Sequence, residues 1–196
     1  NVLLGDEAGT ALTNGTNNVA IGFRALQSED GDGNNIAIGA DALQNLNAGA
    51  TGNNVAIGTN AGNDLTDGLR NVIIGSIAGD QATTIDDCVI IGYNAGGNAA
   101  MTGHDNVLIG KDAGQEMAAG QANVMIGRDS GQATRSGHSN VAIGDQALAT
   151  NIDGDGQVAI GFEALTTSEP ADGQTYNVAV GYRAGKGVTT GVGNTM

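Results

Sequence analysis

The sequence has few of the large side chains that fill ordinary protein cores. Its 196 residues include no tryptophan, two phenylalanines, three tyrosines and a single proline. A composition of this kind argues against an ordinary globular domain. The apolar residues that are present are small or β-branched and occur in clusters, which a disordered chain would not show. We therefore expect a folded chain of unusual architecture.

Three further features of the composition limit the possible functions. The one cysteine, Cys88, cannot form a disulfide within the chain, so the redox compartment is left open. No apolar run approaches the roughly 20 residues that span a bilayer, and no signal peptide is visible, so we expect no membrane insertion in this segment. Seven Lys and Arg residues stand against 21 Asp and Glu residues, for a net charge of −14. That charge disfavours nucleic acid and anionic membranes as partners.

Glycine, in contrast, is abundant, and much of it belongs to a repeat. The phrase Asn-Val-Ala-Ile-Gly stands at 18–22, and close copies follow at intervals of 17 to 20 residues. The eleven copies define coils that start at residues 1, 18, 35, 54, 71, 88, 106, 123, 140, 157 and 177. A fixed period of this kind indicates a single repeat domain over 1–196. We expect this chain to be a fragment of a longer fibre protein.

The phrase itself predicts a short strand. We number its residues 1 to 5, from asparagine to glycine. Side chains alternate along a strand, so positions 2 and 4 share one face and position 3 points to the other. Branched residues at positions 2 and 4 favour extended backbone, and the run is too short for an independent helix. Stacked copies then form an all-β parallel β-solenoid (β-roll) of about eleven coils, roughly 50 Å long at about 4.8 Å per strand.

Position 3 and position 9 vary together. A large residue at one is accompanied by a small residue at the other, as in Ala20 with Leu26 and Ile73 with Gly79, and no coil has two large ones. Closely packed interiors enforce this kind of volume sharing. The two positions are therefore predicted to face each other inside the coil. The predicted coil interior is Ala20, Leu26, Ala37, Leu43, Ile73, Ile90, Leu108, Met125, Ala142, Leu148, Ala159 and Leu165.

Positions 2 and 4 must then face outward, as a continuous apolar stripe that water would not tolerate. We call these residues the outward stripe. Because the stripe is alike from coil to coil, a second copy of the chain matches it, and three copies around an axis close it completely. We therefore expect a parallel homotrimer. Its predicted core is Val19, Ile21, Ile36, Ile38, Val55, Ile57, Val72, Ile74, Val89, Ile91, Val107, Ile109, Val124, Ile126, Val141, Ile143, Val158 and Ile160.

Position 1 is asparagine in nine copies, with Cys88 and Gln157 as replacements. Stacked side-chain amides can form a hydrogen-bonded ladder. The predicted amide ladder is Asn18, Asn35, Asn54, Asn71, Asn106, Asn123, Asn140 and Asn177. The remainder of each coil is polar, and we expect surface loops there. Glycines two to four residues before each phrase are expected to adopt positive φ.

The run Asn18 to Leu26 (Asn-Val-Ala-Ile-Gly-Phe-Arg-Ala-Leu) resembles the head repeats of YadA-like trimeric autotransporter adhesins, and also the related repeats of bacteriophage tail fibres. The resemblance extends over essentially the whole chain. It implies a left-handed, trimeric β-roll that serves as a shaft or an adhesive head. The period is longer than is usual in the bacterial heads, which favours the phage side.

Residues that could support chemistry are few. We expect no catalytic site, because no nucleophile–base arrangement is visible, and His104 and His138 lie about two coils apart, too far to share a zinc ion. Asp30, Asp32, Asp153 and Asp155 alternate with glycine in a pattern that suits calcium, but we favour the interpretation that these are acidic surface loops that keep a fibre soluble. No other cofactor is expected. The aromatic residues Phe23, Tyr93, Phe162 and Tyr182 follow the phrase and offer either a sugar platform or a cover for the flank.

Three functions remain in competition. The first is a structural fibre, most simply a bacteriophage tail-fibre segment located on the virion. The second is an adhesin at a bacterial or viral surface, whose loops bind a host glycan or protein. The third, an ice-binding solenoid, is disfavoured because the threonines occupy different positions of the repeat. The sequence favours the first, with copies of the same chain as partners.

Overall fold

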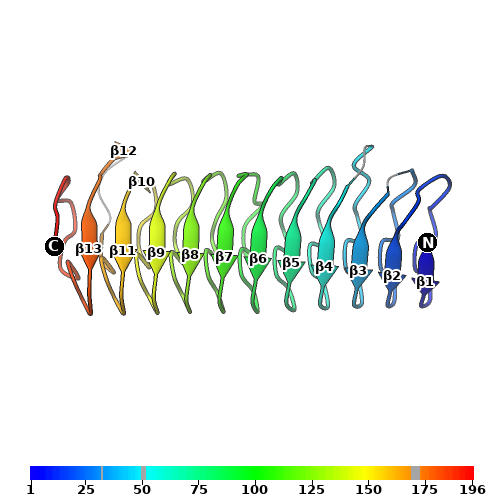
Figure 1. Cartoon of the computed structure of the whole chain (residues 1–196), viewed down its shortest axis with the longest axis horizontal. Coiled ribbons are helices and arrows are strands. Elements are labelled where there is room, and N and C mark those ends of the chain that lie inside the picture. The colour runs from blue at the N-terminus through cyan, green and yellow to red at the C-terminus, as the bar shows by residue number, and fades with distance from the viewer. Residues whose placement is uncertain (32, 50–51, 169–172) are drawn as a thin grey trace.

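The computed structural model describes residues 1–31, 33–49, 52–168 and 173–196, and within them the chain forms a parallel β-solenoid. One short strand from each coil joins an 11-stranded sheet, in the order β1-β2-β3-β4-β5-β6-β7-β8-β9-β11-β13 (Figure 1). A second sheet has two strands, β10 and β12. The strands are β1 (Val2–Leu4), β2 (Val19–Ile21), β3 (Ile36–Ile38), β4 (Val55–Ile57), β5 (Val72–Ile74), β6 (Val89–Ile91), β7 (Val107–Ile109), β8 (Val124–Ile126), β9 (Val141–Ile143), β10 (Gly154–Asp155), β11 (Val158–Ile160), β12 (Gly173–Gln174) and β13 (Val178–Val180).

Every coil of the large sheet stacks in register on the next. Position 2 pairs with position 2 and position 4 with position 4, as Val19 does with Ile36 and Ile21 with Ile38. Coils of different length keep this register, because the strand and its glycine turn have the same length in every coil and the lengths differ elsewhere. The predicted all-β parallel β-solenoid is therefore confirmed.

The side chains at position 3 point into the coil. In β2 to β9, β11 and β13 the middle residue of the strand is buried, while its two neighbours are only partly buried or exposed. All twelve residues that the sequence places in the coil interior have 0% relative exposure.

Positions 3 and 9 also share their space, as the paired substitutions predict. A Cβ atom added to Gly9 would lie 2.8 Å from a methyl group of Leu3, and one added to Gly114 would lie 2.7 Å from a methyl group of Leu108. Carbon atoms do not approach so closely in a packed interior, so in these two coils the leucine at position 3 leaves no room for a side chain at position 9. The contact is looser in the coil of Ile73, where a Cβ atom added to Gly79 would lie 3.6 Å from Ile73.

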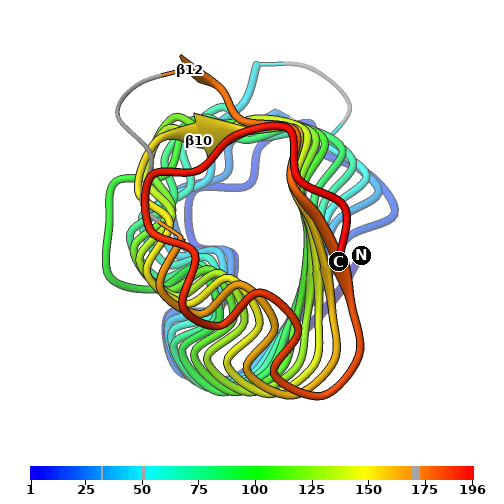
Figure 2. The same cartoon turned by 90° about the vertical axis from the view of Figure 1, so that its left-hand side faces the viewer.

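A third segment contributes to the interior, and here the expectation of plain surface loops was wrong. Leu46, Leu65, Ile85, Met101 and Met117 lie in segments read as polar loops, yet each has 0% relative exposure. A coil made from one strand and one turn would leave a gap in the middle of the oval cross-section seen in Figure 2. These side chains fill that gap, since a void of this size would cost packing energy.

The chain turns sharply at the glycine of position 5. Gly144, which is typical, has φ of 133°, a conformation that L-residues with a Cβ atom rarely adopt. An added Cβ would also lie 2.6 Å from the carbonyl oxygen of Gly161 in the next coil. Two independent constraints therefore require glycine in this turn.

The loop glycines have a different role from the one expected, because most of them do not adopt positive φ. Positive φ occurs instead just before the phrase, at residues such as Asn17 and Asp105. Gly137 shows why glycine stands in the loop: an added Cβ would lie 2.9 Å from the amide nitrogen of Asn140 and 2.6 Å from the carbonyl oxygen of Gly154. Gly52 and Gly120 likewise lie against position 1 side chains, those of Asn35 and Asn123, whereas Gly103 lies against the backbone of the next coil. The loop glycines thus allow close packing between coils.

Candidate functional site

The outward stripe covers one whole side of the solenoid. Its side chains stack along the axis, position on position, and each is partly covered by the coils above and below. Its exposure is greatest toward the ends, for example at Leu4 and Val180, but Ile57 in the interior of the series is also exposed. A straight apolar stripe of this length at the surface of a protein is typical of an interaction surface.

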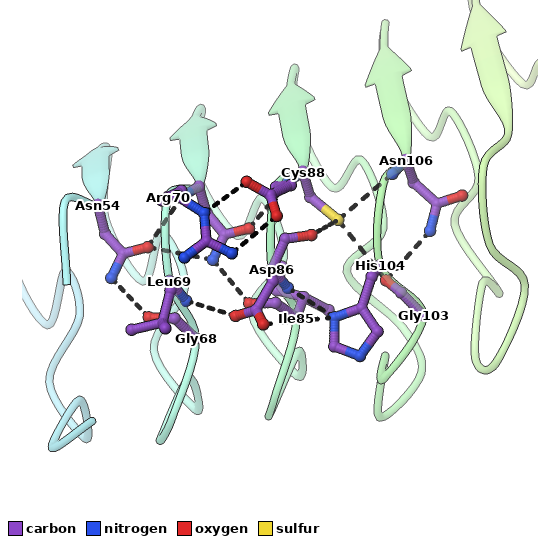
Figure 3. A network of polar contacts seen from close by, with 12 residues as sticks. Asn54, Gly68, Leu69, Arg70, Ile85, Asp86, Cys88, Gly103, His104 and Asn106 are labelled. Atoms are coloured by element: carbon purple, nitrogen blue, oxygen red, sulfur yellow. Dashed lines mark hydrogen bonds and ion pairs between the residues drawn. The ribbon is translucent and has the colours of Figure 1, made fainter. Parts of the chain in front are cut away.

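The asparagines of position 1 form the predicted ladder, although mostly with backbone groups (Figure 3). Most of these side chains bond in two directions, as Asn140 illustrates, whereas only the Oδ1 of Asn35 is paired. Its Nδ2 donates to the carbonyl oxygen of Gly154, at the end of the same coil, at 2.8 Å. Its Oδ1 accepts from the backbone N–H of Gln157, in the next coil, at 2.9 Å. The asparagine therefore closes its own coil and fastens it to the next.

The bonds repeat along the column with nearly the same geometry. The Oδ1 atoms of Asn18, Asn35, Asn54, Asn71, Asn106, Asn123 and Asn177 each accept from the backbone N–H of the position 1 residue of the next coil or its equivalent. Direct amide-to-amide contacts also occur, for example from Asn71 Nδ2 to Asn54 Oδ1 at 3.1 Å. Since all these side chains are buried, each unmade bond would leave a polar group without compensation.

Cys88 replaces asparagine in this column and makes longer, weaker hydrogen bonds than the asparagines do. Its Sγ accepts from the backbone N–H of Asn106 at 3.5 Å and lies 3.6 Å from the carbonyl oxygen of Gly103 (Figure 3). Burial raises the pKa of the thiol to about 11. A buried thiol with this pKa remains protonated at neutral pH, so it is not a reactive nucleophile.

The two histidines link coils. The Nδ1 of His104 accepts from the backbone N–H of Asp86 at 3.0 Å, and the Nδ1 of His138 accepts from that of Gln121 at 3.1 Å. Each ring therefore occupies an inter-coil contact. Within the described residues, no group of three or more His, Cys, Asp or Glu side chains could hold a metal ion.

The calcium candidates are not gathered into one site. The carboxylates of Asp153 and Asp155 accept hydrogen bonds from the preceding coil, from the Ser136 hydroxyl and the His138 backbone N–H respectively. Asp30 belongs to a distant coil, and Asp32 lies outside the described residues. The Asp153 and Asp155 side chains thus act as inter-coil acceptors in this structure.

Opposite charges also link neighbouring coils at the surface. Arg24 Nε lies 2.8 Å from Asp41 Oδ1, Arg70 Nε 2.7 Å from Asp87 Oδ1, and Arg128 Nη2 2.7 Å from Asp145 Oδ2. All seven Lys and Arg residues of the chain form ion pairs. The acidic excess is therefore spread over the surface without basic patches.

A shallow hollow lies beside the loop of the sixth coil. Its volume is about 440 Å³, and it is lined by Asn98, Ala99, Glu116, Ala118 and Arg135. The two charged residues in its wall already pair with each other, at 2.8 Å. The hollow therefore offers no group free to bind a charged ligand strongly.

The aromatic residues that follow the phrase are exposed. Phe162 and Tyr182 stack face to face, with ring centroids 5.4 Å apart, and the guanidinium group of Arg183 lies 5.0 Å from the centroid of Tyr182. One face of each ring is therefore covered by the other ring, while Tyr182 keeps 70% of its exposure. Tyr176, which the sequence did not single out, is also exposed, on the other side of the strand.

The fold and this geometry define a class of protein: a narrow parallel β-solenoid with a buried asparagine column and one continuous outward stripe. No protein-family model matches the chain, and no curated protein or solved structure matches it either. No helix among the described residues has the length and apolar character needed to cross a membrane.

Proposed function

We propose that this chain is the shaft or head segment of a trimeric surface appendage, most simply a bacteriophage tail fibre on the virion. The observation that carries the proposal is the outward stripe. Its side chains face away from the interior of their own coil along the entire rod, although they are as apolar as those inside. Burial of an apolar surface of this kind is the main driving force of permanent association.

Three copies suit this stripe better than two. A parallel pair would bury its two flat faces against each other but leave the edges of the stripe in water. Three copies around one axis place all the stripes toward the centre and leave no edge. The proposed assembly is therefore a parallel homotrimer of left-handed coils with the outward stripes at its core.

The rest of the molecule suits a passive rod. The coils are fastened by buried side-chain hydrogen bonds and by surface ion pairs, and the net charge of −14 keeps the rod soluble. We assign it no catalytic activity, no cofactor and no nucleic-acid partner.

Sedimentation equilibrium tests the assembly. We expect a single species with three times the 19.3 kDa mass of the chain, even at low micromolar concentration. A folded monomer would contradict both the assembly and the fibre role.

The second candidate is an adhesin, bacterial or viral, whose loops bind a host glycan or protein. The loops between the strands favour it because they are the polar, irregular part of each coil, and one of them, drawn in green at the left of Figure 2, stands out from the rod. A glycan array probed with the trimer separates the two functions. Binding that is lost when one of these loops is shortened would favour the adhesin, and no binding would favour the shaft.

A further inference from the structure

The five aromatic residues of the chain all lie beside the outward stripe. Phe23, Tyr93, Phe162 and Tyr182 directly follow the glycine of position 5, and Tyr176 directly precedes position 1. We call the column of residues after the glycine the strand-end border, and the column before position 1 the strand-start border. The aromatic residues of both borders retain between 36% and 70% of their exposure.

This placement is unusual for aromatic side chains. They bury more apolar area than other residues and normally fill the interior or an interface. Here the interior is filled by alanine, leucine, isoleucine and methionine. The chain thus keeps its largest apolar side chains for two exposed columns at the edges of the outward stripe.

The two borders meet when copies of the chain are arranged in a ring. In a parallel trimer the strands run head to tail around the axis, so the end of each strand lies next to the start of the strand in the neighbouring copy. An interface of this type joins two different surfaces of the same molecule. The strand-end border of one copy therefore faces the strand-start border of the next.

The charges of the two borders are complementary in the middle of the rod. At the level of β7, the strand-end border carries Lys111, directly after Gly110. The strand-start border carries Asp105 at the same level, directly before Asn106. Complementary charge of this kind favours the pairing of two surfaces and fixes their orientation.

We propose that the aromatic residues of each border pack against the opposite border of a neighbouring copy and anchor the trimer there. The occupant of the exposed borders is thus a second copy of this chain, and this inference rests on the proposed trimer. Large aromatic residues at the rim of an apolar core contribute strongly to such interfaces.

Tyrosine chemistry tests the proposal directly, because the chain has no tryptophan and its three tyrosines all lie on the borders. The trimer is treated with tetranitromethane, and the nitrated tyrosines are identified by peptide mass spectrometry. We expect slow nitration of Tyr93, Tyr176 and Tyr182 in the trimer, and fast nitration when dilution or the variant Ile143→Asp gives the monomer. The variant Asn98→Tyr adds an exposed tyrosine far from the borders and should react fast in both states.

A second measurement tests the proposal without tyrosine nitration. Tyr93→Ala should raise the concentration at which half of the trimer dissociates by at least tenfold, while far-UV circular dichroism stays unchanged. Asn98→Ala, in an exposed loop, should leave that concentration unchanged. If the wild type is a trimer whose tyrosines react fast and whose dissociation Tyr93→Ala does not alter, the border proposal is overturned and the trimer stands. If the wild type is a monomer, both the border proposal and the proposed trimer are contradicted.

Discussion

At the scale of the residue, the asparagine of position 1 is the side chain on which each coil depends. Its carboxamide has a donor and an acceptor on one rigid group, so it can satisfy a carbonyl of its own coil and an N–H of the next at once. Aspartate lacks the donor, and glutamine places the amide further out. Gln157 therefore recruits extra partners, Asn151 Oδ1 at 2.8 Å and the Ser168 hydroxyl at 2.7 Å.

Replacement of Asn140 by alanine should therefore destabilise the fold strongly. It leaves the buried Gln157 N–H without its acceptor, which costs about 1–3 kcal/mol. It also removes one of the two donors to the Gly154 carbonyl, which still accepts from Asn151 Nδ2, and it leaves a small cavity. We expect a loss of roughly 2–4 kcal/mol in the free energy of unfolding, measured by urea denaturation. Asn98→Ala, at an exposed position, is the matched control and should change it by less than about 0.5 kcal/mol.

The thiol of Cys88 predicts a specific sensitivity to alkali. Its folded pKa of about 11 lies above the ordinary value of 9.0, so above pH 9 the unfolded chain loses the proton first. The stability that this group contributes is complete below pH 9 and is lost as the pH rises to 11. A shift of this size corresponds to about 2–3 kcal/mol.

The measurement compares the wild type with Cys88→Asn between pH 9 and pH 11. All other ionisable groups are the same in both proteins, so the difference isolates the thiol. We expect the wild type to lose more stability over this range than the variant. Parallel curves would show that the thiol is not buried as described.

At the scale of the element, the strand and its turn form one unit whose parts constrain each other. The turn at position 5 admits only glycine, so the strand ends after three residues, and the chain re-enters the interior within four more. Leu148, at position 9, has φ of 54°, which is unfavourable for a residue with a Cβ atom. Burial of this leucine therefore requires some backbone strain.

Gly144→Ala should break this unit. The added methyl group meets the Gly161 carbonyl of the next coil and requires a backbone conformation that alanine disfavours. We expect a loss of about 3 kcal/mol or more, seen as a lower melting temperature. At Gly187 a Cβ atom would meet nothing within 4 Å, and φ is not in the positive range. Gly187→Ala should therefore be nearly neutral.

The shared volume of positions 3 and 9 can be tested with a double-mutant cycle. Ala142→Leu with Leu148 retained should overfill the coil and cost about 1–3 kcal/mol. Adding Leu148→Gly to it should restore most of the stability, since this pairing occurs naturally in coils such as that of Leu108 and Gly114. If the double variant is no more stable than Ala142→Leu alone, the two positions do not compete for space.

Much of this unit could be predicted from the sequence because the chain repeats the same environment eleven times. Position 3 covaries visibly with position 9, and the strand alternates regularly, so the coil interior and the asparagine column could be inferred. The third interior segment could not, because its residues change from Leu46 to Met101 to Thr134 and the loop length changes with them. The role of the loop glycines was predicted wrongly for a related reason. They are required because neighbouring atoms lie close to them, and not because their own φ is positive.

At the scale of the whole molecule, stability is a sum of contacts between successive coils, as in other solenoids. Each coil contacts only its neighbours, through the sheet, the asparagine column and the ion pairs. The surface pairs are largely exposed and contribute little individually. Association through the outward stripe involves every coil, so a change that prevents this association should be visible in the oligomeric state of the chain.

Ile143→Asp tests that association. In the proposed trimer it would place three carboxylates near the axis, where burial of unpaired charge is very unfavourable. We expect monomers in sedimentation equilibrium at concentrations where the wild type is trimeric. Asn98, exposed in a loop away from the outward stripe and its borders, provides the control: Asn98→Asp adds the same charge and should retain the trimer. A trimer of Ile143→Asp with unchanged melting behaviour would contradict the assignment of the axis.

The near-identity of the outward stripe from coil to coil has a consequence for alignment. If one copy of the rod slides past another by a single coil, every valine and isoleucine finds an equivalent neighbour, and only the contacts at the two tips are lost. The stripe can therefore hold copies together without deciding how far they are displaced along the axis. The axial alignment of the copies must therefore be fixed by residues that differ from coil to coil.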